Sequence, residues 1–354
     1  MSKFFTNRYQ ALTPYTPGEQ PRDMQYIKLN TNESPFPPSA KAIEAATKAA
    51  KRLQLYPDPT YKALHEVLAA YHGVTPDMVL ATNGSDEILN FAFMAFCDDE
   101  HPALFADITY GFYSVFAELG GVPYETIPLR EDFSINVDDY INRRGTVFIA
   151  NPNAPTGMAL PLSEIERLLQ SDADRIVVVD EAYVDFGAES AVSLIGKYDN
   201  LLVTQTFSKS RSMAGARLGY GIACKSLIQD LNTVKYSTNP YNVNAMTMAA
   251  GVGTLEDADY TVANCKAVME NREWAAKELL KMGFEMTDSR ANFLFAKHPQ
   301  IKGGDLYLAL RERGILVRHF EKPRICEYNR ITVGSREQME ILIQTIRTIL
   351  EERL

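Results

Sequence analysis

The chain has 354 residues, of which 46% are hydrophobic and 23% are charged, as in ordinary soluble globular proteins. Its formal net charge of −9 offers no basic surface to nucleic acid or to an anionic membrane. The start of the chain is polar, unlike a secretory signal, and no apolar run is long enough to span a membrane. We therefore expect a soluble, cytoplasmic protein of about two domains.

The cysteines and histidines indicate no metal site. Cys97, Cys224, Cys265 and Cys326 lie far apart in the sequence and form no C-x-x-C pair, so a disulfide framework is not indicated either. The five histidines include no pair spaced four residues apart. Gly251-Val252-Gly253 does not open a dinucleotide-binding motif, which argues against a nicotinamide cofactor.

The N-terminal part of the chain predicts an arm followed by a helix. Residues 1–38 are rich in Pro, Thr, Tyr and Asn, which is typical of a segment without regular structure. A helix should begin near Ser39, because the sequence AKAIEAATKAA that follows consists of strong helix formers. The prolines of Tyr56-Pro57-Asp58-Pro59 end this helical stretch.

Residues 39–255 are predicted to form a large α/β domain. Short apolar runs alternate with amphipathic helical stretches, and continuous β-branched runs suit strands that are buried on both faces. We expect a mostly parallel sheet sandwiched by helices, with ligands bound beyond the carboxyl ends of the strands. The clearest strands are Val79–Thr82, Ala103–Phe105, Thr146–Ala150, Arg175–Val179 and Leu201–Thr206.

Residues 256–354 are predicted to form a smaller α+β domain, against which the N-terminal arm packs. A long helical stretch covers Leu255 to Met282. The expected elements after it are a strand at Asn292–Ala296, a helix at Gly304–Arg313, strands at Ile315–Val317 and Arg330–Val333, and a helix from Glu337.

Each predicted strand of the large domain is followed by residues suited to binding a cofactor. After the first strand, Gly84 allows a tight turn, and Ser85 or Asp86 can cap a new helix whose N-terminus attracts anions, although a plain helix cap would look the same. After the second, Tyr110 can lie flat on a planar ring or belong to the core. After the third, Asn153 can reach a ring oxygen or serve only the turn.

The fourth and fifth strands end in charged groups. Asp180 is costly to desolvate unless it meets a positive partner, and a protonated pyridine nitrogen is such a partner. Three residues later, Tyr183 can hydrogen-bond a ring hydroxyl. Lys209 suits a Schiff base with an aldehyde cofactor.

Hydroxyl and guanidinium groups surround this lysine. Thr206, Ser208 and Arg217 can hold the phosphate of such a cofactor. A Ser-Lys pair alone is usually a solvated loop. The whole series of strand ends, in one chain order, favours a cofactor site.

At these residues the chain resembles the fold type I, aspartate aminotransferase-like enzymes that use pyridoxal 5'-phosphate, and among them the histidinol-phosphate aminotransferases. The resemblance runs from about Leu12 to the C-terminus. Its most specific segments are Leu29–Pro35, Tyr56–Asp58, Val179–Phe186, Lys209–Arg217 and Asn329–Gly334.

The resemblance implies a role for each candidate residue. Lys209 would bind the cofactor covalently, Asp180 would pair with its pyridine nitrogen, Tyr183 would contact its ring oxygen, and Tyr110 would stack on the ring. The phosphate would be surrounded by Gly84, Ser85, Asp86, Thr206, Ser208 and Arg217.

The resemblance also implies substrate contacts and a partner subunit. Arg330 would bind the substrate carboxylate, with Tyr15, Asn32 and Arg318 nearby. Tyr56 matches a tyrosine that the neighbouring subunit supplies, so a homodimer with shared active sites is expected.

One position departs from the family pattern. The family usually has Asn directly before Pro-Thr-Gly, whereas this chain has Ala154 there and Asn153 one residue earlier. Asn153 is our candidate for the ring-oxygen contact, and the alternative is that Tyr183 makes it alone.

The implied activity is transamination between an amino donor and a 2-oxo acid, with ping-pong kinetics. Histidinol phosphate with 2-oxoglutarate is the first choice of substrates. The alternatives are an aromatic amino acid aminotransferase, a lyase that decarboxylates threonine phosphate, and a regulatory protein that binds pyridoxal phosphate without catalysis.

Overall fold

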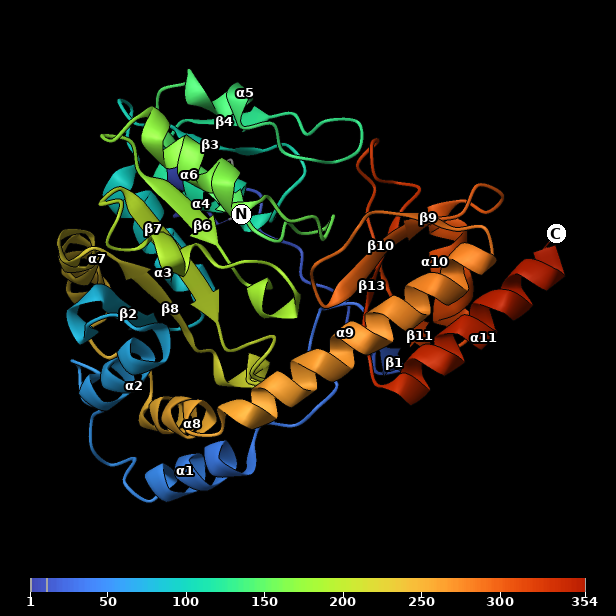
Figure 1. Ribbon diagram of the computed structural model, residues 1–354, viewed down its shortest axis with the longest axis horizontal. Coiled ribbons are helices and arrows are strands. Elements are labelled where there is room, and N and C mark those ends of the chain that lie inside the picture. The colour runs from blue at the N-terminus through green and yellow to red at the C-terminus, as the bar shows by residue number, and fades with distance from the viewer. Residues whose placement is uncertain (1, 11, 354) are drawn as a thin grey trace.

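The computed structural model describes residues 2–10 and 12–353 of the chain. A larger part is built around a seven-stranded sheet and a smaller part around a four-stranded sheet (Figure 1). The long helix α9 (Ala258–Lys281) extends from the larger part across the smaller one. The predicted α/β fold with a smaller α+β domain is confirmed.

The seven-stranded sheet is mixed, because β8 runs antiparallel to both of its neighbours while the other strands are parallel to one another. All five predicted strands are present, although β6 begins at Val177 instead of Arg175 and ends on Asp180. In spatial order the strands are β2 (Val79–Thr82), β8 (Gly219–Ala223), β7 (Leu201–Thr206), β6, β5 (Thr146–Ala150), β3 (Ala103–Ala106) and β4 (Tyr124–Ile127).

Alternate residues of each strand enter cores on opposite faces of this sheet. Val178 packs on one face, whereas Val177 and Val179 pack on the other. The first face is covered by α3 (Ser85–Phe96), α4 (Phe112–Gly120) and α7 (Lys225–Thr238). The second is covered by α2 (Lys62–His72), α6 (Leu162–Ser171) and α8 (Ala245–Leu255), with the short α5 (Asp138–Ile141) beside α6.

The smaller sheet is antiparallel, in the order β12 (Arg318–His319), β13 (Asn329–Thr332), β10 (Phe293–Lys297) and β9 (Glu285–Met286). The strand expected over Ile315–Val317 is replaced by two very short ones, β11 (Ile315–Leu316) and β12. The helices α9, α10 (Gly303–Glu312) and α11 (Arg336–Arg353) pack on the smaller sheet and complete the core of the smaller part.

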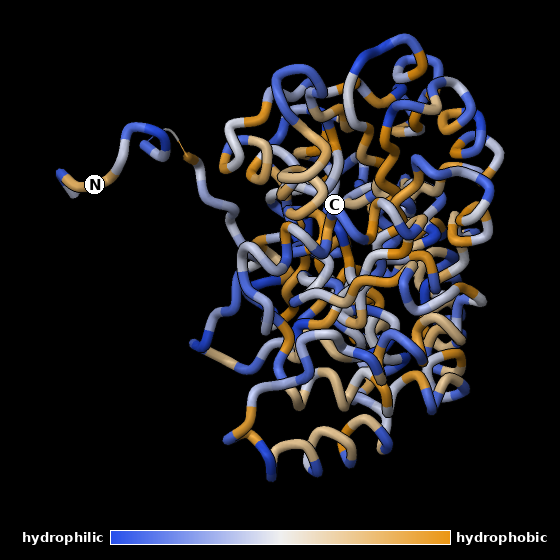
Figure 2. The backbone as a smooth tube through the Cα atoms, turned by 90° about the vertical axis from the view of Figure 1, so that its left-hand side faces the viewer, coloured by the Kyte–Doolittle hydropathy of each residue, from blue (hydrophilic) through white to orange (hydrophobic). Residues whose placement is uncertain are grey.

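The N-terminal segment joins the smaller part. β1 (Ile27–Lys28) pairs in parallel with β11, and Leu29 enters the smaller core. Helix α1 (Ala40–Ala50) begins as predicted, with the Ser39 hydroxyl accepting a hydrogen bond from the Ala42 amide at 3.2 Å. Figure 2 shows the first residues extending away from the body of the molecule. None of the described helices has the length and apolarity to cross a membrane.

Candidate active site

The carboxyl ends of the parallel strands converge on a cavity of about 320 Å³. Because β2, β3, β5, β6 and β7 are parallel, their ends open onto the same edge of the sheet. Most of the predicted cofactor residues line this cavity, namely Ser85, Asp86, Tyr110, Asp180, Tyr183, Thr206, Ser208, Lys209 and Arg217.

An anion-binding cup is formed where α3 begins. Gly84 has φ +78°, and a Cβ on it would lie 2.6 Å from Arg217 Nη2, so only glycine lets the guanidinium approach this turn. Gly219 of β8 also approaches this turn closely, since a Cβ on Gly219 would lie 2.3 Å from the Ser85 amide nitrogen. The free N–H groups of the helix start and the guanidinium thus share one small space, which favours a phosphate.

Side chains at the mouth of this cup are held by one another. Arg217 Nη2 donates to Asp86 Oδ2 at 3.1 Å, and Tyr110 Oη donates to Asp86 Oδ1 at 2.6 Å. The hydroxyls of Thr206 and Ser208 lie 3.0 Å apart at the end of β7. These contacts fix the Tyr110 ring at the wall of the cavity, where it can stack on a planar ligand.

Asp180 is a buried carboxyl, 5% exposed, at the end of β6. It accepts hydrogen bonds from Tyr113 Oη at 2.9 Å and from Thr204 Oγ1 at 3.3 Å. Within residues 2–10 and 12–353, no salt bridge involves it. Burial raises its pKa to about 6. A protonated ring nitrogen in the cavity would supply the positive partner that this carboxyl needs to stay charged.

Lys209 is half-buried and lines the same cavity as Asp180. Its Nζ donates to the Thr31 carbonyl at 3.2 Å and lies 5.9 Å from the centre of the Tyr183 ring. Burial, and then the charge of Arg330, lower its pKa to about 8. At neutral pH it is therefore unprotonated more often than a solvated lysine, as a nucleophile and proton carrier must be.

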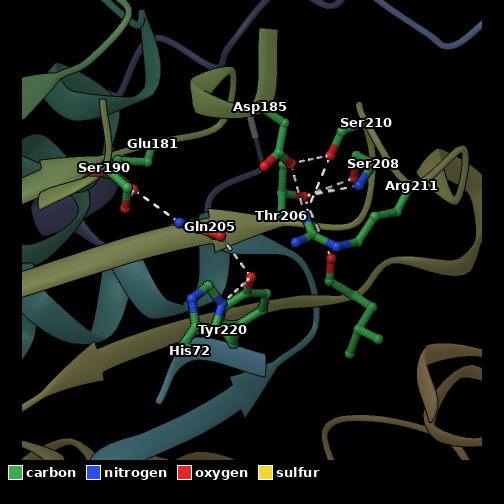
Figure 3. A network of polar contacts seen from close by, with 11 residues as sticks. His72, Glu181, Asp185, Ser190, Gln205, Thr206, Ser208, Ser210, Arg211 and Tyr220 are labelled. Carbon is green, nitrogen blue, oxygen red and sulfur yellow. Dashed lines mark hydrogen bonds and ion pairs between the residues drawn. The ribbon is translucent and has the colours of Figure 1, made fainter. Parts of the chain in front are cut away.

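The segments that carry Lys209 and Tyr183 are tied together (Figure 3). Arg211, with its side chain 2% exposed, donates from Nη1 to Asp185 Oδ2 at 3.0 Å. The Ser210 hydroxyl also donates to Asp185. Because Asp185 and Arg211 each follow a site residue by two positions, this ion pair fixes the two loops relative to each other.

A second set of hydrogen bonds is centred on Gln205 (Figure 3). Gln205 Nε2 donates to Glu181 Oε2 at 2.8 Å, and Tyr220 Oη donates to Gln205 Oε1 at 2.6 Å. His72 Nε2 lies 2.9 Å from the same tyrosine hydroxyl. These bonds join β6, β7, β8 and α2 through their side chains and hold the strand ends in register.

A second cavity, of about 280 Å³, adjoins the first. Lys209, Tyr183 and Tyr110 line both. The predicted substrate residues line the second one, namely Tyr15, Asn32, Arg318 and Arg330. Phe320 and Lys322 are among its other lining residues, which were not predicted.

Arg330 is the central cation of the second cavity. Its Nη2 donates to the Asn30 carbonyl at 3.0 Å, while its buried Nε has no hydrogen-bond partner among the described residues. The guanidinium carbon lies 5.4 Å from the centre of the Phe293 ring. A buried donor without a partner, on a guanidinium facing a cavity, suits an anionic ligand.

Asn32 lines the second cavity and contacts Tyr183, which lines both cavities. It adopts a left-handed conformation with φ +56°, and its Nδ2 donates to Tyr183 Oη at 3.0 Å. Its backbone amide donates to Thr332 Oγ1 at 2.9 Å. Burial raises the pKa of Tyr183, so its hydroxyl stays protonated and can donate to a ring oxygen.

Asn153 does not reach the cofactor cavity. Its Nδ2 donates to the Ile108 carbonyl at 2.9 Å and to Thr156 Oγ1 at 3.1 Å, while its Oδ1 accepts from Thr109 Oγ1 at 2.7 Å. It lines a separate cavity, and Ala154 faces the cofactor cavity instead. The expected contact between Asn153 and a ring oxygen is therefore not supported, because the local hydrogen bonds of the turn hold its amide elsewhere.

Tyr56 lies outside both cavities of its own chain. It is 82% exposed, and its ring stacks on Tyr241 at 4.7 Å between centroids.

Several residues around the cofactor cavity and Asp180 were not predicted from the sequence. Thr31 and Glu33 line the cofactor cavity, and Tyr113 and Thr204 hydrogen-bond Asp180. Thr204 gave a usable signal, because it is a polar residue within an apolar strand, and it pairs with Asp180 in the sheet register.

Residues 24–346 match the model of the family described as aminotransferase class I and II. The chain belongs to this family of aminotransferases.

Relatives with known names are similar over the whole length. Histidinol-phosphate aminotransferase 2 of Dechloromonas aromatica is 48% identical, with 99% of both chains covered. Histidinol-phosphate aminotransferase 1 of Bradyrhizobium diazoefficiens is 47% identical, over 99% of this chain and 100% of the relative. The crystal structure of histidinol-phosphate aminotransferase from Sinorhizobium meliloti in complex with pyridoxal-5'-phosphate has the same fold, with a TM-score of 0.88, 22% identity and 99% of each chain covered.

Proposed function

We propose that the chain transfers an amino group from histidinol phosphate to 2-oxoglutarate, with pyridoxal 5'-phosphate as its cofactor. The observation that carries the proposal is the junction of two cavities at Lys209 and Tyr183, one bearing a buried carboxyl and an anion cup, the other bearing Arg330. The named relatives, similar over the whole length, support the same substrates.

The residues of the first cavity fit this cofactor. Arg217, with Gly84 and the start of α3, would hold the phosphate, and the close approach that only glycine permits is what such a cup requires. Asp180 would pair with the pyridine nitrogen, which gives its buried carboxylate a positive partner. Tyr183 would donate to the ring oxygen. The bound cofactor supplies an electron sink for the charge that develops at the substrate α-carbon.

The side chains then divide the work of proton transfer. Lys209 Nζ, with its lowered pKa, removes the proton from the substrate α-carbon and later returns one. Asp180 keeps the positive charge of its partner in place through the reaction. Asn32 holds the Tyr183 hydroxyl at 3.0 Å, and so fixes the direction of the hydrogen bond that this tyrosine donates.

The second cavity suits anions of two kinds. Histidinol phosphate carries a phosphate and no carboxylate, whereas 2-oxoglutarate carries two carboxylates. A guanidinium binds both groups through paired hydrogen bonds. Arg330 would therefore serve both half-reactions, with Arg318 and Lys322 lining the same cavity as further cations.

Replacing Arg330 by lysine should raise KM for both substrates by about 10- to 100-fold, because a point charge cannot reproduce a two-pronged contact. The change in kcat should be smaller. Steady-state kinetics with each substrate in turn measures both constants. Arg324→Lys is the matched control, since Arg324 binds Asp107 and the Leu129 carbonyl and lines neither cavity. Equal KM values for the Arg330 variant and wild type would contradict the assignment.

The donor can be identified directly with the holoenzyme. Histidinol phosphate, phenylalanine and threonine phosphate are added one at a time while the absorbance of the bound cofactor is followed. Histidinol phosphate should convert the cofactor to its amine form, and phenylalanine should do so much more slowly. Carbon dioxide released from threonine phosphate would identify a decarboxylase and overturn the proposal.

We also propose a homodimer with shared sites. Tyr56 lies at an exposed corner with Leu53 and Leu55, which are 54% and 53% exposed, and such a patch is typical of an interface. The N-terminal segment extends from the body with Phe4 80% exposed, as an arm that embraces a neighbour would (Figure 2). Tyr56 would then reach the cofactor cup of the partner subunit.

Sharing predicts complementation between two inactive variants. In a hybrid of Lys209→Ala and Tyr56→Ala subunits, one of the two sites would contain both intact residues. That hybrid should recover about half of the wild-type activity per dimer, measured after mixing under dissociating conditions and purification by two different tags. Hybrids with no more activity than either parent would show that the sites are not shared.

We further propose domain bounds and a cellular location for the chain. We propose an arm over residues 1–38, a larger domain over 39–255 and a smaller one over 256–354, supported by the pairing of β1 with β11 and by the start of α9 at Ala258. A cytoplasmic location is supported by the four free cysteines, which fit a reducing compartment.

A further inference from the structure

Asn242 connects two segments that the proposed function assigns to different active sites. It lies in the turn between α7 and α8 and is 6% exposed. On one side it meets the start of α3, which forms the cofactor cup of its own subunit. On the other side it meets the loop of residues 56–61, which carries Tyr56.

The contacts with the cup come from both sides of Gly84. The Asn242 carbonyl accepts a hydrogen bond from Asn83 Nδ2 at 2.9 Å, and its Nδ2 donates to Glu87 Oε2. The same Glu87 oxygen accepts from the Asn83 amide at 2.6 Å. Glu87 is in the first turn of α3, directly after Asp86, so a shift of the cup moves the groups that hold Asn242.

The contacts with the loop include a buried hydrogen bond. Tyr61, 1% exposed and with φ +52°, donates its hydroxyl to Asn242 Oδ1. Lys235 Nζ lies 3.9 Å from the centre of the Tyr61 ring and donates to the Pro59 carbonyl at 2.7 Å. Tyr241, the residue before Asn242, stacks on Tyr56.

We propose that Asn242 and Tyr61 are positioning residues that couple the cofactor cup of each subunit to the Tyr56 which that subunit supplies to its partner. Their polar atoms are mutually satisfied in a packed setting, so the loop cannot shift independently of the turn. The inference rests on the proposed sharing of Tyr56. It adds that the tyrosine is held at the correct position by a network anchored at the other active site.

A hybrid dimer isolates this effect. One subunit is wild type, and the other carries Lys209→Ala, so only the wild-type subunit has a working site. The Tyr56 that reaches this working site belongs to the Lys209→Ala subunit. Tyr61→Phe or Asn242→Ala is then added to the Lys209→Ala subunit alone. The control adds Tyr236→Phe, which removes another hydroxyl bonded to the Pro59 carbonyl, at 3.1 Å, but outside the Asn242 network.

Either network variant should raise KM and speed the loss of lysine-bound cofactor from the working site by about 2- to 30-fold, the range for residues that couple two sites. The cofactor loss is followed by absorbance during dialysis. Tyr236→Phe should change neither quantity. Tyr61→Phe removes a single oxygen, so it tests the idea even where Asn242→Ala does not fold.

The two proposals fail in different ways. Adding Tyr56→Ala to the Lys209→Ala subunit tests sharing itself, and a fully active wild-type site in that hybrid would refute the proposed sharing of Tyr56. If that hybrid is impaired while the Tyr61 and Asn242 hybrids match the parent, sharing stands and the coupling is refuted.

Discussion

Replacing Lys209 by alanine should lower kcat by about 10⁴-fold or more, because the chain would lose both its covalent anchor for the cofactor and its proton carrier. Among the described residues, Lys209 is the one lysine that lines both cavities of the site. Steady-state kinetics with histidinol phosphate and 2-oxoglutarate gives the value, and the absorbance of the lysine-bound cofactor should vanish.

The Lys209→Arg variant tests whether a positive charge at this position is enough for activity. Arginine keeps the positive charge but does not give up its proton near neutral pH, so it should be as inactive as alanine. Circular dichroism and the Tm of both variants check that the fold persists. Full transaminase activity in either variant would refute the role of Lys209.

Replacing Asp180 by asparagine should lower kcat by about 10²- to 10³-fold, as expected for loss of one preorganised electrostatic partner. The amide keeps the shape of the carboxyl and its setting beside Tyr113 and Thr204, but it carries no charge to retain a proton on the pyridine nitrogen. Tyr113→Phe, which removes one hydrogen bond and leaves the carboxylate, should cost much less. Equal kcat for Asp180→Asn and wild type would exclude the pairing.

The same variant has a signature in the cofactor-free protein. Burial raises the pKa of Asp180 from 3.8 to about 6, so the folded chain holds this proton more tightly than the unfolded chain does. The carboxyl therefore destabilises the fold as pH rises from about 4 to 6. At about pH 8, Asp180→Asn should raise the free energy of unfolding by roughly 1–3 kcal/mol. Denaturant unfolding should show a gain that shrinks below about pH 4. A gain independent of pH would rule out the charge as its cause.

The candidate site could be predicted from the sequence because the pattern that indicates it, an apolar run followed by polar residues, lies within each strand and the turn after it. An apolar β-branched run followed by Asp180, and another followed by Ser208 and Lys209, predicts both the strand and the side of the sheet where its polar end lies. The strand β8 was missed since Gly219 and Gly221 break the apolar pattern, and their small size becomes meaningful only beside Ser85 and Ile88.

The other differences come from contacts between distant segments. Whether Asn153 or Ala154 faces the cavity depends on bonds to Thr109 and to the Ile108 carbonyl, which the sequence of the turn does not reveal. Tyr113 reaches Asp180 only because α4 packs against the end of β6. The position of Tyr113, three residues after Tyr110, does not indicate this contact.

The arginines of the two cavities are associated with different sheets. Arg217, in the first cavity, follows β7 of the larger sheet, whereas Arg318 and Arg330 lie on β12 and β13 of the smaller one. With the roles proposed above, the arginines that bind substrate are encoded in a different stretch of the gene from Asp180 and Lys209. Recombination or directed evolution confined to residues 318–330 can therefore change what the enzyme accepts while its catalytic apparatus is inherited intact.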